Sequence, residues 1–275
     1  MAETARFRFG RIEVDNANLP SPEVLHNNID NQFRERSTKV VVEGEDPISL
    51  DEKGMNSYLS NGRGERDFCY FTYVSEKERS RVERQEDSDE LVPTSDRSPV
   101  RPRVFYFDNG LYAYESQQGL AKAWIPQYIG KRTGTEIKSQ PEIAFSQRTM
   151  FEFYEKWDDI TLFRFGASDE ELEEGDEFGK ALNELAETVS SQEFRGSKNL
   201  KGLGMFDEAA NKTEILALRG KKGDDFTTNI LQSGTKEIKW DKPDVPNNEL
   251  NGAQAEAMYQ RLSPILRKIE RDLNL

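Results

Sequence analysis

The sequence contains very little cysteine and histidine, and this scarcity narrows the chemistry open to it. Cys69 is the only cysteine, which excludes an intramolecular disulfide and a cysteine-based zinc site. His26 is the only histidine, so a mechanism of the Ser-His-Asp or Cys-His type would depend on that one residue. Scarce cysteine is typical of proteins from a reducing compartment, and we therefore expect a cytoplasmic location.

Long apolar runs are also missing. No uninterrupted apolar stretch approaches the length that spans a bilayer, and the first ten residues lack the apolar segment of a signal peptide. Hydrophobic residues make up 35% of the chain and charged residues 32%, but 16 Phe, 9 Tyr and 3 Trp still supply large side chains for a core. We expect a soluble globular protein without direct membrane insertion.

Acidic residues outnumber basic ones, because 51 Asp and Glu stand against 38 Lys and Arg and give a formal net charge of -13. This balance fits ordinary solubility, adaptation to a salty cytoplasm, or a surface that imitates a nucleic acid, and it argues against a globally cationic nucleic-acid-binding surface. The chain also lacks a P-loop, a G-x-G-x-x-G fingerprint and a G-x-S-x-G nucleophile motif. The common nucleotide-binding and hydrolase signatures are therefore absent.

The hydrophobic pattern predicts an α+β fold with mainly antiparallel sheets, helices packed on one side and a long C-terminal helix. The clearest local signal is a β-hairpin whose tight turn is Asn109-Gly110. Predicted strands are 5–14, 39–42, 67–74, 104–107, 111–114, 142–146, 159–165, 215–218, 227–231 and 236–240. Predicted helices begin at Pro22, near Leu120, near Met150, at Phe178 and near Asn248, and Pro264 predicts a kink in the last one.

Composition also suggests how the chain is divided. Residues 75–101 are highly charged, nearly devoid of aliphatic side chains and closed by Pro93 and Pro99. This is typical of an exposed, mobile connection. We expect an N-terminal α/β region over 1–100 that ends in this connection, and a C-terminal α+β domain over 101–275.

A magnesium-dependent nuclease is one functional hypothesis. Nucleases of the Asp…Glu-x-Lys type use two acids to hold the metal and a lysine to orient or activate water. Glu136-Ile137-Lys138 has the required spacing, with Asp108 upstream in the hairpin. The same alternation is typical of a half-exposed strand, so Asp108, Glu136 and Lys138 are weak catalytic candidates, and we expect no resident metal or cofactor outside this alternative.

The positive clusters oppose the overall sign of the chain. Between Phe194 and Gly223 seven basic residues face only three acids, and glycines separate the basic positions. Glycine lets the backbone approach a bound group closely, so this basic stretch suits contact with phosphates without reading of bases. The alternative is an ordinary solvated loop. The candidate nucleic-acid-binding residues are Arg195, Lys198, Lys201, Arg219, Lys221 and Lys222, with Lys131 and Arg132 as a second, smaller cluster.

The C-terminal half, from about Glu136 to Leu275, contains the strand Asp159–Phe165, the basic glycine-separated stretch, and a final helix with 255-AEAMY-259, Arg261 and Ile265-Leu266. In these features it resembles the phage-exclusion protein RexA and the Kiwa defence protein KwaB. It implies a sequence-tolerant DNA-binding protein that forms a homodimer and acts against phage. No motif places a functional residue of that family on this chain.

Together these features predict a non-enzymatic, sequence-tolerant DNA-binding protein of an anti-phage or exclusion system. DNA is the expected partner, with a homodimer and a second defence-system protein as further expectations. Two alternatives stay open: the magnesium-dependent nuclease, and an acidic interaction or inhibitor module that engages a basic partner.

Overall fold

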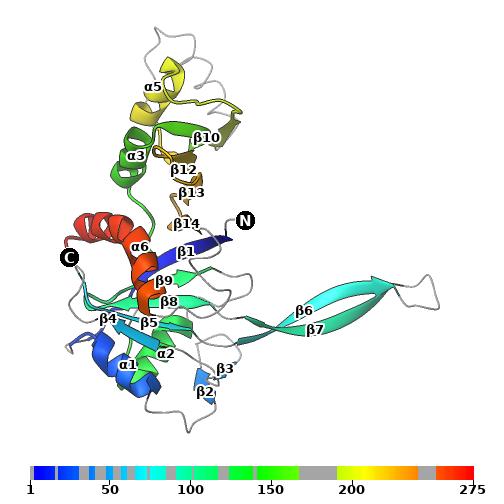
Figure 1. Cartoon of the computed structure of the whole chain (residues 1–275), viewed down its shortest axis with the longest axis vertical. Helices are drawn as coiled ribbons and strands as arrows, with labels where there is room; N and C mark the ends of the chain where they lie inside the picture. The colour runs from blue at the N-terminus through cyan, green and yellow to red at the C-terminus, as the bar shows by residue number, and fades with distance from the viewer. Residues whose placement is uncertain are drawn as a thin grey trace. The chain divides into compact units, whose positions relative to one another are not determined.

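The computed structural model describes the chain in thirteen segments (Figure 1). These are residues 3–15, 18–30, 37–40, 48–51, 57–60, 66–72, 75–84, 91–100, 102–116, 124–138, 141–166, 191–240 and 252–275. The predicted helix from Phe178 lies outside them.

Two compact units make up the chain. Unit 1 comprises Met1–Phe9, Glu142–Asp244 and Tyr259–Leu275, and unit 2 comprises Gly10–Pro141 and Val245–Met258. The chain thus leaves unit 1 within the first strand, returns to it at Glu142, leaves again after Asp244 and re-enters it within the last helix. This division does not follow the boundary predicted near residue 100, because strand β1 (Glu3–Arg11) and helix α6 (Gly252–Leu273) each contribute to both units.

The α+β architecture with antiparallel strands and a long C-terminal helix is confirmed. The large antiparallel sheet has ten strands. Unit 1 holds the order β11 (Ser191–Arg195), β10 (Asp159–Gly166), β12 (Ile215–Lys221), β13 (Thr228–Leu231), β14 (Thr235–Trp240) and β1. Unit 2 holds β9 (Leu111–Glu115), β8 (Arg103–Phe107), β5 (Phe68–Thr72) and β4 (Ser57–Ser60).

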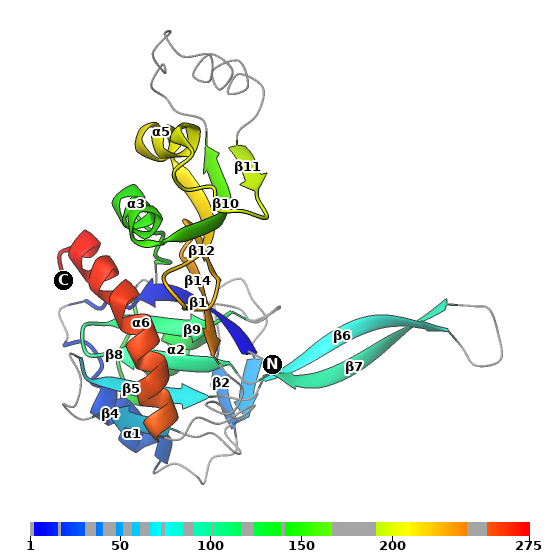
Figure 2. The ribbon, with the colours of Figure 1, turned by 45° about the horizontal axis from the view of Figure 1, so that its top comes forward.

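In unit 1 the helices α3 (Gln147–Lys156) and α5 (Gly204–Lys212) lie on the same face of the sheet (Figure 2). Ser146 caps α3, because its hydroxyl accepts a hydrogen bond of 3.1 Å from the backbone N–H of Thr149. Aromatic rings fill the space between helices and strands: Phe163 is fully buried and packs edge-on against both Tyr154 and Phe206.

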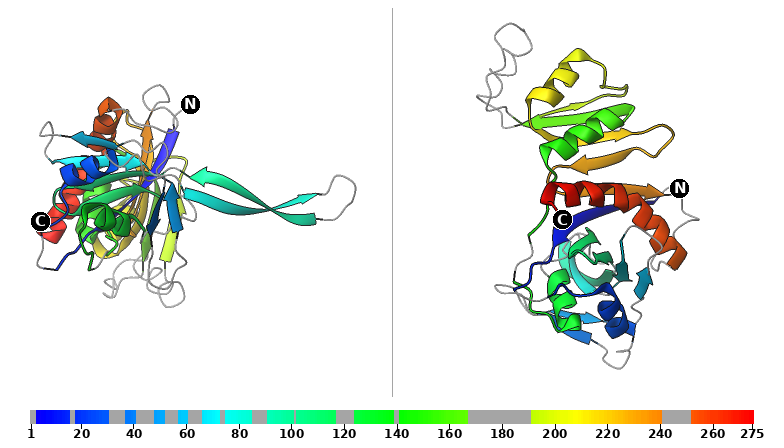
Figure 3. Two further views of the ribbon diagram at one scale, coloured as in Figure 1. Left: turned by 90° about the horizontal axis from the view of Figure 1, so that it is seen from below. Right: turned by 90° about the vertical axis from the view of Figure 1, so that its left-hand side faces the viewer.

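In unit 2 helices α1 (Pro22–Asp30) and α2 (Trp124–Thr133) lie side by side (Figure 3). They cover a buried core that includes Phe71, Tyr106 and Tyr128. The predicted hairpin is confirmed as β8 and β9, and Gly110 in its turn has φ +81°.

Two sequence predictions differ from the structure. Residues 75–101 contain two paired ten-residue strands, β6 (Ser75–Arg84) and β7 (Leu91–Val100), because backbone pairing needs no aliphatic side chain. The strand predicted at 142–146 is wrong, because this segment makes only scattered backbone bonds, from Ile143 to Phe9 (3.1 Å) and from Phe145 to Gln232 (2.7 Å).

Strands β2 (Ser37–Val40) and β3 (Ile48–Asp51) pair with each other.

Candidate phosphate-binding pocket

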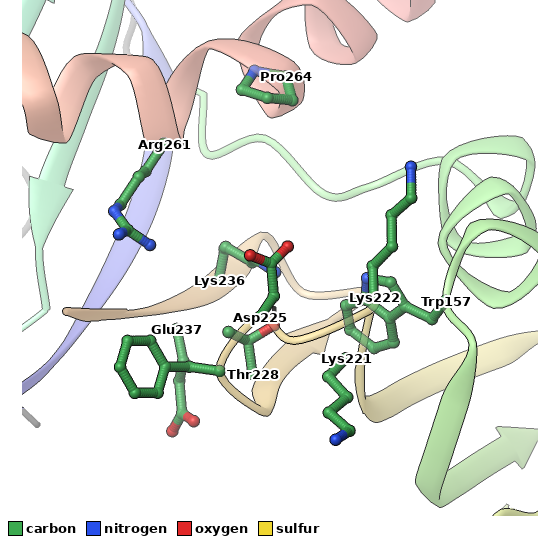
Figure 4. Close-up of a pocket in the computed structure, with 10 residues that line it drawn as sticks. Trp157, Lys221, Lys222, Asp225, Thr228, Lys236, Glu237, Arg261 and Pro264 are labelled. Atoms are coloured by element: carbon green, nitrogen blue, oxygen red, sulfur yellow. Dashed lines mark hydrogen bonds between the residues drawn. The ribbon is translucent and has the colours of Figure 1, made fainter.

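A pocket of about 280 Å³ lies in unit 1, beside the connection between β12 and β13 (Figure 4). Its walls come from the end of α3, the connection itself, β14 and the part of α6 that belongs to unit 1. The lining residues are Trp157, Lys221, Lys222, Asp225, Phe226, Thr228, Lys236, Glu237, Arg261 and Pro264. We call this site the basic pocket.

Glycines fix the β12 end of the basic pocket. A Cβ at Gly220 would lie 2.6 Å from the ring of Trp157, so only glycine lets β12 pass so close to that ring. Gly223 has φ +54°, and its N–H donates a 2.7 Å hydrogen bond to Oδ2 of Asp158. These contacts hold the backbone of Lys221 and Lys222 in place beside the pocket.

The pocket has an excess of positive charge. Four of its lining residues are basic (Lys221, Lys222, Lys236 and Arg261) and two are acidic (Asp225 and Glu237), which leaves a formal excess of two positive charges. Figure 4 shows the side chain of Arg261 extending from α6 toward the strands, and Lys236 rising from β14 behind Asp225.

The acidic residue Glu237 is already engaged by other groups. Nε of Arg6 donates a 2.8 Å hydrogen bond to Oε1 of Glu237, and the side-chain amide of Asn229 donates to Oε2. Oδ1 of Asn229 in turn accepts a 2.6 Å hydrogen bond from Nε of Arg219. The negative charge of Glu237 is therefore largely balanced from outside the basic pocket.

Most other basic side chains of unit 1 have acidic partners, but the pocket lysines do not. Within the described residues, Lys221, Lys222 and Lys236 form no ion pair. Lys222 is exposed and Lys221 is half-buried. Cations without a carboxylate partner favour an anionic ligand, because binding then displaces no existing ion pair.

Lys236 is half-buried and is the pocket lysine that packs against aromatic rings. Its Nζ donates a 2.8 Å hydrogen bond to Oγ1 of Thr228 and lies 5.0 Å from the ring centre of Trp157 and 5.4 Å from that of Phe153. Burial lowers the pKa of Lys236 to about 8, although the nearby charges of Glu237 and Asp225 act in the opposite direction. Lys236 is therefore a cation at neutral pH that loses its charge in mildly alkaline solution.

The structure brings only two of the six predicted residues of the basic stretch into the pocket. Arg195 pairs with Glu193 at 2.7 Å on β11, and Lys198 is exposed. Nζ of Lys201 donates to the backbone carbonyls of Glu155 and Trp157, at 2.6 Å each, and so caps the C-terminal end of α3. The fourth residue outside the pocket is Arg219, which is bonded to Asn229 as described above.

The second predicted basic cluster belongs to unit 2. Lys131 and Arg132 both lie in the last turn of α2, where positive charge favours the helix dipole. The Arg132 guanidinium carbon lies 5.7 Å from the ring centre of Tyr128, and the side chain is buried. Arg132 thus has a packing role, whereas Lys131 is exposed.

The three nuclease candidates are all in unit 2 and make ordinary surface contacts. Asp108 pairs with Arg66 at 3.2 Å, and Nζ of Lys138 lies 2.7 Å from Oδ1 of Asp15. Glu136 is exposed. In the described part of the chain, no group of three or more His, Cys, Asp or Glu side chains is placed to hold a metal ion. These contacts add no support to the nuclease hypothesis.

Sequence reasoning missed Lys236 and Arg261 as site residues. Lys236 appears in the sequence as one position of a predicted strand, and Arg261 as a polar position on the last helix. Their proximity to Lys221 and Lys222 depends on the pairing of β13 with β12 and β14, and on where α6 packs. The feature that marks Lys236 as unusual is its contact with the rings of Phe153 and Trp157. Those residues are distant from Lys236 in sequence, so the sequence alone does not reveal this contact.

Comparison with known proteins leaves the chain without an assigned family. No protein-family model matches the sequence, and no curated protein matches it. The resemblance to the exclusion and defence proteins therefore stays a prediction. None of the helices in the described segments has both the length and the apolar character needed to cross a bilayer.

Proposed function

We propose that this chain is a non-enzymatic, sequence-tolerant DNA-binding protein whose basic pocket binds backbone phosphates. The observation that supports this function is the set of lysines on the pocket, Lys221, Lys222 and Lys236, which have no acidic partner among the described residues. Lysine acts as a point charge that contacts phosphate, and phosphate contacts fix position without reading sequence.

The net charge of -13 shapes how such binding depends on salt. A locally positive pocket on an acidic chain attracts phosphate only at short range, because the acidic surface around it repels DNA and charges farther apart than the Debye length of about 8–10 Å are largely screened. We therefore expect moderate affinity that falls steeply as salt concentration rises.

The test is a salt series of binding to a random-sequence duplex that carries 5′-hydroxyl ends. The variant Lys221→Gln/Lys222→Gln removes two charges from the pocket, and Arg195→Gln/Lys212→Gln removes two charges from residues paired with Glu193 and Glu208. If the two pocket lysines each neutralise a phosphate, the pocket variant should flatten the slope of log K against log salt by about 1.8. The control variant should leave that slope nearly unchanged.

Equal weakening by both variants would show that overall charge, and not the pocket, determines binding. Absence of salt-sensitive retention in the wild type would remove the DNA-binding proposal altogether. Gel electrophoresis of the duplex after incubation with the protein and magnesium should show intact DNA, and cleavage that Glu136→Gln abolishes would instead support the nuclease alternative.

We further propose a cytoplasmic homodimer that acts in phage defence or exclusion with a second protein, as the resemblance implies. Light scattering at micromolar concentration should then give twice the monomer mass of 31.6 kDa. A mass of 31.6 kDa would contradict the dimer while leaving the phosphate-binding proposal intact.

A further inference from the structure

The cations of the basic pocket differ in their surroundings. Lys222 is exposed, whereas Lys221 and Lys236 are both half-buried. Only Lys236 packs against aromatic rings, those of Phe153 and Trp157, and Trp157 is only 6% exposed. A ligand bound to Lys236 therefore lies beside an apolar wall of the pocket.

Lys236 has hydrogen-bonding capacity left for such a ligand. An ammonium group carries three N–H donors, and the contacts of Lys236 within the described residues use one of them, toward Thr228. Its other close neighbours are aromatic faces, which attract a cation but accept no strong hydrogen bond. Two donors thus remain for oxygen atoms of a ligand in the pocket.

An internal phosphodiester can contact the exposed Lys222 of this pocket, but it fits less well around Lys236 than a terminal phosphate does. It carries one negative charge and is flanked by a sugar on both sides, so it meets a binding surface along a continuous backbone. A terminal phosphate carries about -1.5 to -2 charges and three acceptor oxygens at neutral pH, and only one side of it is attached to the ligand. The pocket volume of about 280 Å³ is enough for such a group with part of the sugar it ends.

We propose that the basic pocket binds a terminal phosphate, the phosphomonoester that ends a nucleotide or a nucleic-acid strand, with Lys236 as the cation that contacts it. This inference rests on phosphate binding at the same pocket and specifies the ligand of that pocket. The half-buried Lys221 and the exposed Lys222 line the same pocket and add positive charge beside Lys236.

The dependence on pH follows from the groups around the pocket. The charged groups to consider are Lys221, Lys222, Asp225, Lys236, Glu237, Arg261 and, above the ring of Phe153, Lys268. Burial lowers the pKa of Lys236 to about 8, so the pocket loses one positive charge above that pH. The phosphomonoester loses one negative charge below its second pKa of about 6. Affinity should therefore be highest between about pH 6 and pH 8, whereas a phosphodiester would show no decline near pH 6.

The experiment is calorimetric titration of the full chain with AMP and with adenosine, and of duplexes with 5′-phosphate or 5′-hydroxyl ends. We expect AMP or the 5′-phosphorylated duplex to bind at least tenfold tighter than its unphosphorylated counterpart. Lys236→Met keeps the length of the side chain and should abolish this preference. Lys198→Met removes the same charge from an exposed position outside the pocket and should preserve it.

The arms of the experiment separate the possible outcomes. Preference for AMP alone identifies a free nucleotide as the source of the phosphate, and preference for the phosphorylated duplex identifies a strand end. Salt-sensitive binding of both duplexes with equal affinity, together with no preference for AMP over adenosine, would overturn the terminal-phosphate inference and leave general DNA binding in place. A preference that survives Lys236→Met would also overturn it. Binding of AMP without binding of any duplex would overturn the DNA-binding proposal and support the terminal-phosphate inference. Should Lys236→Met fail to fold, a wild-type affinity for AMP that stays flat between pH 5 and pH 9 would equally overturn it.

Discussion

Glu152 on α3 forms ion pairs with two cations on α6. Its carboxylate accepts hydrogen bonds from Lys268 and Arg271, both on α6 within unit 1. Partial burial by itself raises the pKa of Glu152, but the hydrogen bonds from these two cations outweigh it, and the pKa of the carboxyl is lowered. We predict that Glu152→Gln loosens the contact between the two helices.

The exposure of the groups sets the size of the effect. The side chains of Glu152 and Lys268 are 20% and 10% exposed, so the pair is neither a surface ion pair worth about 0–1 kcal/mol nor a fully buried one worth about 3–5 kcal/mol when one partner is removed. Arg271 is 34% exposed and adds little. We expect Glu152→Gln to lower the free energy of unfolding by about 1–2 kcal/mol.

Urea denaturation followed by circular dichroism measures this loss. Glu155→Gln is the matched control, because Glu155 lies exposed on the same helix and its side chain makes no hydrogen bond or ion pair within the described residues. A glutamate with a lowered pKa contributes stability above its ordinary value of 4.5, and this contribution is lost as pH falls through the lowered pKa. The wild type and Glu152→Gln should therefore converge in acid. Equal losses for Glu152→Gln and Glu155→Gln at pH 7 would refute this reasoning.

Two further predictions concern a turn and a helix cap. Gly234→Ala should lower the free energy of unfolding by about 3 kcal/mol, because φ of Gly234 is +85° and a Cβ there would overlap the carbonyl oxygen of Ile143. Urea denaturation measures this loss. The control is Gly204→Ala, which should not measurably lower the free energy of unfolding, because the space around Gly204 is open. Lys201→Met should lower the free energy of unfolding by about 1 kcal/mol, because Lys201 caps α3, and it should leave the salt dependence of DNA binding unchanged. A flatter slope of log K against log salt in this variant would instead show that Lys201 contacts phosphate.

Sequence periodicity correctly predicted the type and bounds of the elements that have strong local signals. The hairpin with Gly110 and the strand β10 lie within two residues of their predicted bounds, because alternating aromatic residues and a turn glycine specify them locally. Helix α5 was missed because glycines and lysines on both sides of it suggested a loop. Its buried Phe206, Ala209 and Ala210 were too short an apolar pattern to outweigh them.

The candidate site could be predicted only in part, since its residues are brought together by strand pairing. Lys221 and Lys222 stood out as adjacent basic residues between glycines. Lys201 belongs to the same basic stretch and also stands beside a glycine, yet its ammonium group donates hydrogen bonds to the backbone carbonyls at the end of α3. Local composition cannot distinguish a lysine that caps a helix from one that is available to a ligand, because the difference lies in which backbone is nearby.

The pairing of β1 with β14 has a consequence for synthesis on the ribosome. Arg6 and Glu237 are partners separated by 231 positions, and unit 1 also requires Tyr259–Leu275. While the chain is being made, one edge of β1 stays unpaired until β14 (Thr235–Trp240) has been translated. An unpaired strand edge attracts other chains, so the nascent protein should depend on chaperones, and truncated products should aggregate.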